Sequence, residues 1–216
     1  MTTRSMAATV FAVLALATAC RGLPGSGVEK TETRKMQKIT RCIEVHGAVE
    51  VAVEIGEKPP SLVVQGDDNL LPHLNTNVNG PCLSIGTDVE VRPSLPLHVA
   101  VQLEGLDEVT ASGAMKLDVK GLKNETFGVH LSGASAAELA GDVTRLTVDV
   151  SGVASVKAQD LKAHEAQVHL SGAGSVAVFA DRAVDAHISG AGKIDVWGKP
   201  QKIEKEISGI GVLQTH

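Results

Sequence analysis

The amino-acid sequence predicts an all-β fold: a single-stranded parallel β-helix, or β-solenoid, with coils of about 19 residues. The first observation is a repeated phrase that ends in Ser-Gly and has apolar residues one and three positions before the serine. It occurs at Ser112, Ser132, Ser151, Ser171, Ser189 and Ser208, so that successive serines are 20, 19, 20, 18 and 19 residues apart. A period this steady indicates one structural unit per repeat.

The second observation is an alternation of apolar and polar residues around each serine. Around Ser151 the apolar residues are Leu146, Val148, Val150, Val156 and Ala158. A period of two is typical of a strand and not of a helix. One such unit cannot bury its inward face, whereas parallel units stacked about 4.8 Å apart can.

The third observation is the scarcity of aromatic residues, which predicts a slim core of small branched side chains. The aromatic residues are Phe11, Phe127, Phe179 and Trp197, and tyrosine is absent. The repeated serines are interpreted as a ladder at one corner, because a hydroxyl both donates and accepts, and the following glycine permits the bend. In the sixth copy Lys205 replaces the valine or alanine of the other copies, as expected of an end coil.

Residues 1–19 are predicted to be a signal peptide. The apolar run from Ala7 to Ala19 has 13 residues, too few to span a bilayer. It leads into Leu16-Ala-Thr-Ala-Cys20, which resembles a bacterial lipoprotein signal with Cys20 as the lipidated residue. The alternative is ordinary secretory cleavage near Ala19 with Cys20 as a free thiol. We expect export across the inner membrane and a lipid anchor in the outer membrane or at the cell surface.

Two further regions follow the signal. Residues 20–38 are rich in glycine, threonine and charge, which predicts a flexible tether. Residues 39–101 alternate as strands and are interpreted as the opening coils of one β-solenoid domain over 39–216. Cys42 and Cys82 either form a disulfide in an oxidising envelope or remain two buried thiols.

Charge and polar columns limit the chemistry. The net charge of −5 argues against a nucleic-acid partner, which needs a basic face. Two residues before the serines lie Thr110, His130, Asp149, His169, His187 and Glu206. Their parity places them outward on successive coils, and His169, His187 and Glu206 form the best candidate set of zinc ligands. The alternative is a solvated polar column.

A second outward column contains Asp118, Glu138, Lys157 and Asp195. Carboxylates on adjacent coils could serve a polysaccharide lyase or hydrolase, whereas the simpler interpretation is a solvated strand face. No phosphate loop or other cofactor motif is present, so we predict no cofactor and no catalytic residues.

Several phrases resemble one known family. They are Val45-His-Gly47, Gly66-Asp-Asp-Asn-Leu70, Leu83-Ser-Ile85, Ser132-Gly-Ala134, Ser171-Gly-Ala-Gly174 and Ser189-Gly-Ala-Gly192. Together with the lipoprotein-like start, they resemble the family of putative auto-transporter adhesins with a head GIN domain. The resemblance implies a right-handed parallel β-helix in the cell envelope, and no catalytic residues.

The predicted function is that of a non-catalytic envelope lipoprotein acting in adhesion, scaffolding or binding of a surface ligand. Its flat faces also predict association into homo-oligomers. One alternative is a carbohydrate-active β-helix enzyme. Another is a surface metal-binding protein that uses the column of His130, His169 and His187.

Overall fold

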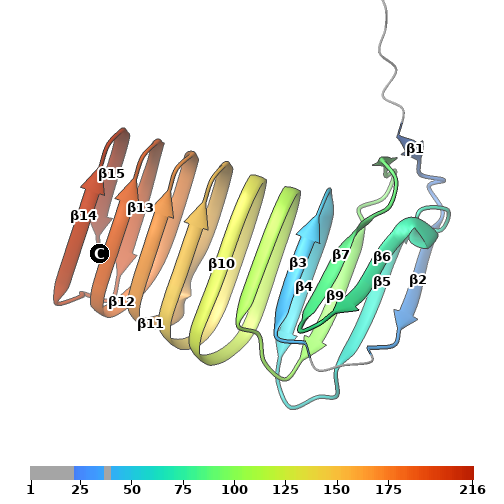
Figure 1. The fold of residues 1–216 in the computed structure, drawn as a ribbon, viewed down its shortest axis with the longest axis horizontal. Coiled ribbons are helices and arrows are strands. Elements are labelled where there is room, and N and C mark those ends of the chain that lie inside the picture. The colour runs from blue at the N-terminus through green and yellow to red at the C-terminus, as the bar shows by residue number, and fades with distance from the viewer. Residues whose placement is uncertain (1–21, 37–39) are drawn as a thin grey trace, which may run out of the picture.

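The computed structural model describes residues 22–36 and 40–216, and these residues form an all-β fold (Figure 1). The all-β prediction is therefore confirmed. The strands are β1 (Leu23–Pro24), β2 (Glu29–Arg34), β3 (Cys42–His46), β4 (Val49–Ile55), β5 (Ser61–Asp67), β6 (Leu74–Asn79), β7 (Cys82–Thr87), β8 (Val91–Arg92), β9 (His98–Leu103), β10 (Glu108–Val150), β11 (Val153–Leu170), β12 (Ala173–Ile188), β13 (Ala191–Trp197), β14 (Lys202–Ile207) and β15 (Ile210–Thr215). A short 3-10 helix, η1, covers Leu71–His73.

From β10 onward, successive repeats pair in parallel and in register. Asp149 lies beside His169, His169 beside His187, and His187 beside Glu206. The strands β11 and β12 are long because the backbone continues through a bend at the lower edge of the stack in Figure 1, and β10 is longer still because it also continues through the Ser-Gly corners at Ser112 and Ser132. Each repeat therefore contributes a strand segment to both sides of the stack.

The alternation predicted around the serines is confirmed by burial. Leu146 and Val148 are fully buried and Val150 is 2% exposed, while Asp149 between them points outward. The buried side chains are mainly Val, Leu, Ile and Ala and form one continuous core. Phe127, at 1% exposure, is the largest fully buried side chain, so the core consists mainly of small aliphatic side chains, as the composition predicts.

The predicted single-stranded right-handed parallel β-helix over 39–216 is wrong, because the main sheet mixes parallel and antiparallel pairs. Strand β5 pairs antiparallel with both β2 and β9, and β6 pairs antiparallel with β7. The β6–β7 pair is a hairpin whose two-residue loop contains Gly80 at φ +63°. A glycine with positive φ in so short a loop reverses the chain direction.

Residues 39–101 are also not a run of successive opening coils. Strand β3 lies between β7 and β10, and β4 lies between β9 and β10 (Figure 1). The strands β3 and β4 thus come first in the chain although they lie beside β10. The chain then forms β5 and β6 at the antiparallel end, and β7 and β9 fill the place between that end and β3 and β4. The segment between β4 and β7 lacks the Ser-Gly corner of the later repeats, so nothing in it directs the chain straight to the next layer.

The predicted tether differs from the structure over residues 22–34. Strand β1 pairs in parallel with β8, and β2 is the edge strand beside β5. The signal segment with Cys20, and the end of the predicted tether at residues 37 and 38, lie outside the described residues. In the part of the chain that is described, no helix is long and apolar enough to cross a membrane.

A buried carboxylate holds this N-terminal segment in place. Asp67 is fully buried and accepts hydrogen bonds from the backbone N–H groups of Gly27 at 2.7 Å, Ser94 at 2.9 Å and Leu95 at 3.0 Å. Burial alone would raise the pKa of Asp67, but these N–H donors outweigh it and hold the pKa below its ordinary value of 3.8. The ionised carboxylate therefore joins three chain segments.

Candidate functional site

The outward column of Thr110, His130, Asp149, His169, His187 and Glu206 forms a continuous polar ladder across the repeats. From Thr110 to His187 its residues alternate with buried aliphatic residues, which fixes their side chains on the outer surface. Asp149 bridges two histidines: its Oδ2 lies 2.8 Å from His130 Nδ1 and its Oδ1 lies 3.0 Å from His169 Nδ1. The sequence therefore identifies the members of the ladder correctly.

The far end of the polar ladder contains the three residues predicted as zinc ligands. The rings of His169 and His187 stack with centroids 5.0 Å apart and planes 8° from parallel. The Nδ1 of His187 then lies 3.2 Å from Glu206 Oε2, and its Nε2 lies 3.0 Å from Asp185 Oδ1.

This arrangement does not form the predicted metal centre. The lone pair of an imidazole nitrogen lies in the plane of its ring, so two face-to-face rings direct their nitrogens in parallel and not at one point. Among residues 22–36 and 40–216, no group of three or more His, Cys, Asp or Glu side chains could hold a metal ion. The structure brings His169, His187 and Glu206 together in sequence along the ladder, but not around a common centre.

The second outward column, with Asp118, Glu138, Lys157 and Asp195, consists of ion pairs. Lys157 Nζ lies 2.8 Å from Glu138 Oε1, and Lys120 Nζ lies 2.7 Å from Asp118 Oδ2. The hydrogen bond from Lys157 holds the pKa of Glu138 below its ordinary value of 4.5.

The pKa of Asp195, in the same column, is also lowered. Burial would raise the pKa of Asp195, but hydrogen bonds from His216 and Lys193 lower it below 3.8. A general acid of a glycosidase needs a raised pKa. The environments of Glu138 and Asp195 shift the pKa in the opposite direction.

A shallow trough crosses the outer surface of β5, β9, β4 and the start of β10. It consists of two adjoining hollows of about 340 and 320 Å³, which share Ala52, Ala100 and Asp118. The short side chains of Val63, Ala100 and Ala52 form its floor. One wall contains Gln65, His98, Glu50 and Lys116, and the other contains Ser61, Gln102, Glu54 and Lys120.

One wall of the trough contains an unsatisfied amide. Gln102 is 8% exposed, and its Nε2 is buried without a hydrogen-bond partner among the described residues. On the other wall, His98 Nδ1 lies 3.2 Å from Glu50 Oε2. An orphaned buried donor costs free energy, so the Nε2 of Gln102 is a local cost in this wall.

Sequence reasoning missed the trough. Its walls come from strands that are distant in the chain and that are brought together by the antiparallel β5–β9 pair. A local signal existed in Ala52 and Ala100, two short side chains at outward positions where polar residues would be usual.

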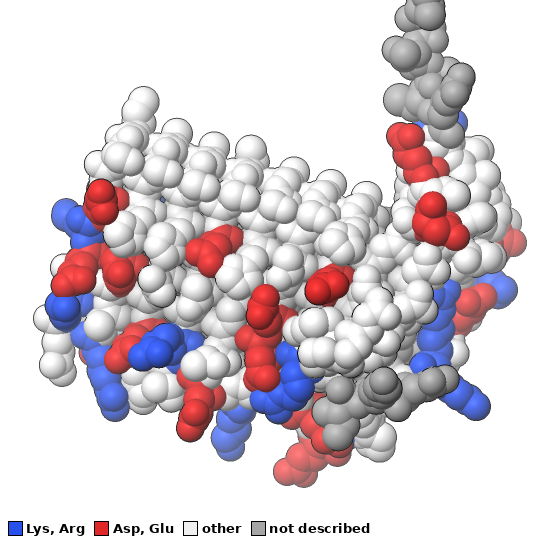
Figure 2. Space-filling view, viewed as in Figure 1, with Lys and Arg blue, Asp and Glu red and all other residues white. Residues whose placement is uncertain are grey.

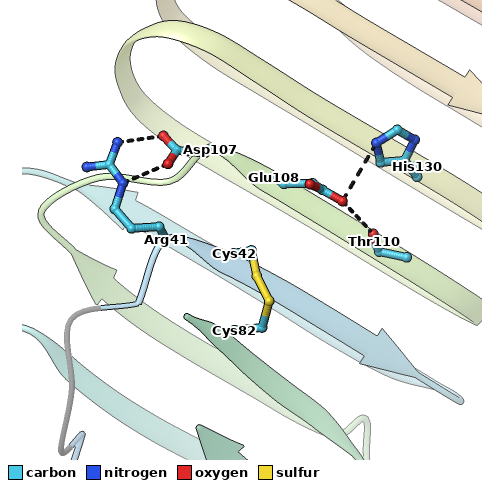
Figure 3. Close-up of a disulfide and its surroundings, with 7 residues drawn as sticks. All are labelled: Arg41, Cys42, Cys82, Asp107, Glu108, Thr110 and His130. Atoms are coloured by element: carbon cyan, nitrogen blue, oxygen red, sulfur yellow. Dashed lines mark hydrogen bonds and ion pairs between the residues drawn. A yellow bond between two sulfur atoms is a disulfide. The ribbon is translucent and has the colours of Figure 1, made fainter. Parts of the chain in front are cut away.

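Cys42 and Cys82 are joined by a disulfide between β3 and β7 (Figure 3). They are direct register partners, with Cα atoms 4.5 Å apart and 40 residues apart in sequence. In the chain-entropy model such a loop closure contributes about 4 kcal/mol. Beside it, Arg41 Nε donates to Asp107 Oδ2 at 2.8 Å, which fixes the entry to β10 (Figure 3). The disulfide therefore stabilises the pairing of β3 with β7, two strands that are not consecutive in the chain.

Charges of both signs are interspersed over the lower part of the face seen in Figure 2, whereas the upper edge carries few. The neighbouring pairs, such as Arg145 with Glu165 at 2.8 Å and Lys202 with Glu204 at 2.7 Å, are exposed. Exposed pairs of this kind contribute little to stability. The outer surface thus favours solubility, with the ladder and the trough as its distinctive features.

Comparison with known proteins gives one family and several similar folds. The family model described as putative auto-transporter adhesin, head GIN domain, matches residues 41–200. No curated protein matches the chain. Among solved structures, a putative adhesin from Bacteroides fragilis has a TM-score of 0.72 and 18% identity, and the match covers 90% of this chain and 100% of that chain.

Two further solved structures are similar in fold. A putative lipid binding protein from Parabacteroides distasonis has a TM-score of 0.54 and 22% identity, with 91% of this chain and 100% of that chain covered. A putative adhesin from Parabacteroides merdae has a TM-score of 0.50 and 18% identity, with 90% and 99% covered. At these identities the likeness concerns the fold.

Proposed function

Because this chain belongs to the family of putative auto-transporter adhesins with a head GIN domain, we propose that it is a non-catalytic protein that binds a ligand at the cell surface. The family resemblance inferred from the Ser-Gly-Ala phrases is thereby confirmed. The family is one of adhesin-like cell-surface proteins, which supports a binding role over a catalytic one. Scaffolding in the envelope would use the same rigid, charged outer surface.

The trough is the observation that carries this proposal. Binding sites combine apolar surface with a few well-placed polar groups, and here Ala52, Ala100 and Val63 lie between two hydrogen-bonding walls. Carboxylates at Glu50, Glu54 and Asp118 accept hydrogen bonds, and the ammonium groups of Lys116 and Lys120 donate them. A polar chain molecule such as a surface glycan suits this trough, with its hydroxyls on the walls and its C–H faces on the floor.

The runner-up is a carbohydrate-active enzyme acting on such a chain. It would require a carboxyl group whose pKa is raised so that it can act as a general acid. The lowered pKa values of Glu138 and Asp195 favour binding without hydrolysis.

The test is a substitution that fills the trough with a large side chain. The full-length protein is displayed on a bacterial surface, and adhesion of these cells to epithelial monolayers and to immobilised cell-surface polysaccharide is counted. We expect Ala100→Trp to reduce adhesion at least about tenfold, because the indole would occupy the space between the walls.

Ala177→Trp is the matched control. Ala177 lies in the same outward column as Ala100, on β12 and outside the trough. Equal adhesion by the wild type, Ala100→Trp and Ala177→Trp would show that the trough is not the binding surface. An adhesion no greater than that of cells without the protein would contradict the adhesion role itself.

We also propose that Cys20 is lipidated and holds the protein in the outer membrane or at the cell surface. Gly22, where the described chain begins, follows Cys20 by two residues, a span of at most about 7 Å. Since β1 and Asp67 fix the next residues to the body, such an anchor would hold the body close to the lipid surface.

A further inference from the structure

The C-terminal end of the stack, formed by β14 and β15 at the left of Figure 1, is open. In the preceding layer, Val184 is 2% and Ile188 is 1% exposed. Their direct register partners in β14 are Ile203 and Ile207, which are 39% and 38% exposed. The inward side chains are thus buried in one layer and partly exposed in the next, because no described strand follows.

The backbone is uncovered at the same place. Strand β14 pairs with β12 and strand β15 pairs with β13, so each uses one edge and leaves its outer edge without a strand partner among the described residues. Free edges are templates for pairing with another chain. On both sides of the stack these edges face the same direction, away from the core.

A second copy of this chain is the partner that fits this end. The exposed surface is the one that every earlier repeat presents to its successor, so it continues an interface already formed inside the molecule. Two copies related by a two-fold axis could pair β14 with β14 and β15 with β15 in antiparallel fashion. Such a contact would bury Ile203 and Ile207 of both copies.

One residue opposes this contact. In the inward column the residues are Val109, Val129, Val148, Val168, Ala186 and, at the open end, Lys205. End-to-end pairing would bury the ammonium group of Lys205 among aliphatic side chains, and an unpaired buried charge is costly. An inward-pointing charge is a known means by which natural sheets prevent edge pairing.

We propose that the C-terminal end of the stack is a self-association surface that Lys205 keeps closed, so that the protein does not pair end to end with a second copy. This inference is independent of the ligand and of the proposed adhesion role. It predicts that removal of one charge, at one position, creates a dimer.

The test is analytical ultracentrifugation of the full-length protein, purified in detergent, over a concentration series. We expect the wild type to show no end-to-end dimer over this series. Lys205→Val should dimerise, with a dissociation constant at least about a hundredfold below the lower limit that the series sets for the wild type. Lys205→Arg keeps the charge and should behave as the wild type. Lys202→Val removes an equal charge from the outward side of the same strand and should also behave as the wild type.

A second substitution locates the contact. Adding Ile207→Lys to Lys205→Val restores a charge on the inward side of the same strand and should abolish the dimer, while circular dichroism melts verify that each variant is folded. The proposal is overturned if folded Lys205→Val associates no more than Lys202→Val. It is equally overturned if the wild type already dimerises as tightly as Lys205→Val, or if the double variant remains dimeric.

Discussion

At the scale of single residues, two charged side chains in unusual positions have opposite consequences. Asp67 is buried and ionised, and three backbone N–H donors compensate its loss of solvent. Lys205 occupies an inward position at an open end, where nothing compensates its charge if a second chain covers it. Asp67 therefore fixes the N-terminal segment to the body, whereas Lys205 opposes the association of a second chain with the C-terminal end.

Replacement of Asp67 by asparagine should destabilise the protein and remove one source of pH dependence. Because the folded-state pKa of Asp67 is lowered, its stabilisation is fully present above the ordinary pKa of 3.8 and is lost as the pH falls through the lower folded value. We expect Asp67→Asn to lower Tm by about 5 °C at pH 7, since the amide is a weaker acceptor.

The measurement is a set of thermal melts between pH 7 and pH 2.5. The Tm difference between wild type and Asp67→Asn should shrink as the pH falls below 3.8. A difference that stays constant over this range would contradict the assignment of an ionised Asp67. Asp160→Asn, the same chemical change at an exposed residue of β11, is the control and should change Tm little.

At the scale of the structural element, the Ser-Gly corner of a repeat, between its two strand segments, depends on the close approach of neighbouring backbones. Gly133 adopts φ +105°, a region that other residues rarely enter. A Cβ on Gly133 would press on the carbonyl oxygen of Gly113 and lie 2.9 Å from its nitrogen. Ser132 Oγ donates to the carbonyl of Ala111 at 3.2 Å across the same corner. The recurring Ser-Gly is thus a corner device, and its function is structural.

Gly133→Ala should therefore destabilise the stack by about 2–4 kcal/mol, through backbone strain and the clash with Gly113. Urea unfolding followed by circular dichroism measures the change. Ala134→Ser alters the exposed next residue by a similar volume and should change the free energy of unfolding by less than about 0.5 kcal/mol. Equal stability of Gly133→Ala and Ala134→Ser would refute the corner interpretation.

At the scale of the whole molecule, the main mixed sheet has two ends that differ. One end consists of β2, β5 and β6, which pair antiparallel with their neighbours, and the N-terminal segment is fixed there. The other end is open at β14 and β15. If Cys20 is lipidated as proposed, the anchor would hold this N-terminal end near the lipid and leave the outer surfaces of the body available to a ligand.

The anchor can be tested in cells that process lipoproteins. We expect the wild type to incorporate labelled palmitate and to fractionate with membranes, whereas Cys20→Ala should lose the label and appear in the soluble envelope fraction. Cys42→Ala is the control for cysteine loss and should keep the label. Labelling of Cys20→Ala equal to the wild type would contradict lipidation at this residue.

Sequence alone determined the all-β class, the repeat length and the outward or inward side of most residues from Val109 onward. These features are local, because the alternation of side chains along a strand needs no knowledge of its neighbours. The members of the polar ladder and the family resemblance could be identified on the same basis.

Only the tertiary structure decided which strands lie side by side before β10. The placement of β3 between β7 and β10, the antiparallel end, and the trough all arise from contacts between distant residues, such as Cys42 with Cys82 and Ala52 with Ala100. The tertiary structure also decided that His169 and His187 stack and do not converge on a metal ion. Strand partnership depends on the fit of surfaces that meet only after folding, and no local period in the sequence encodes that fit.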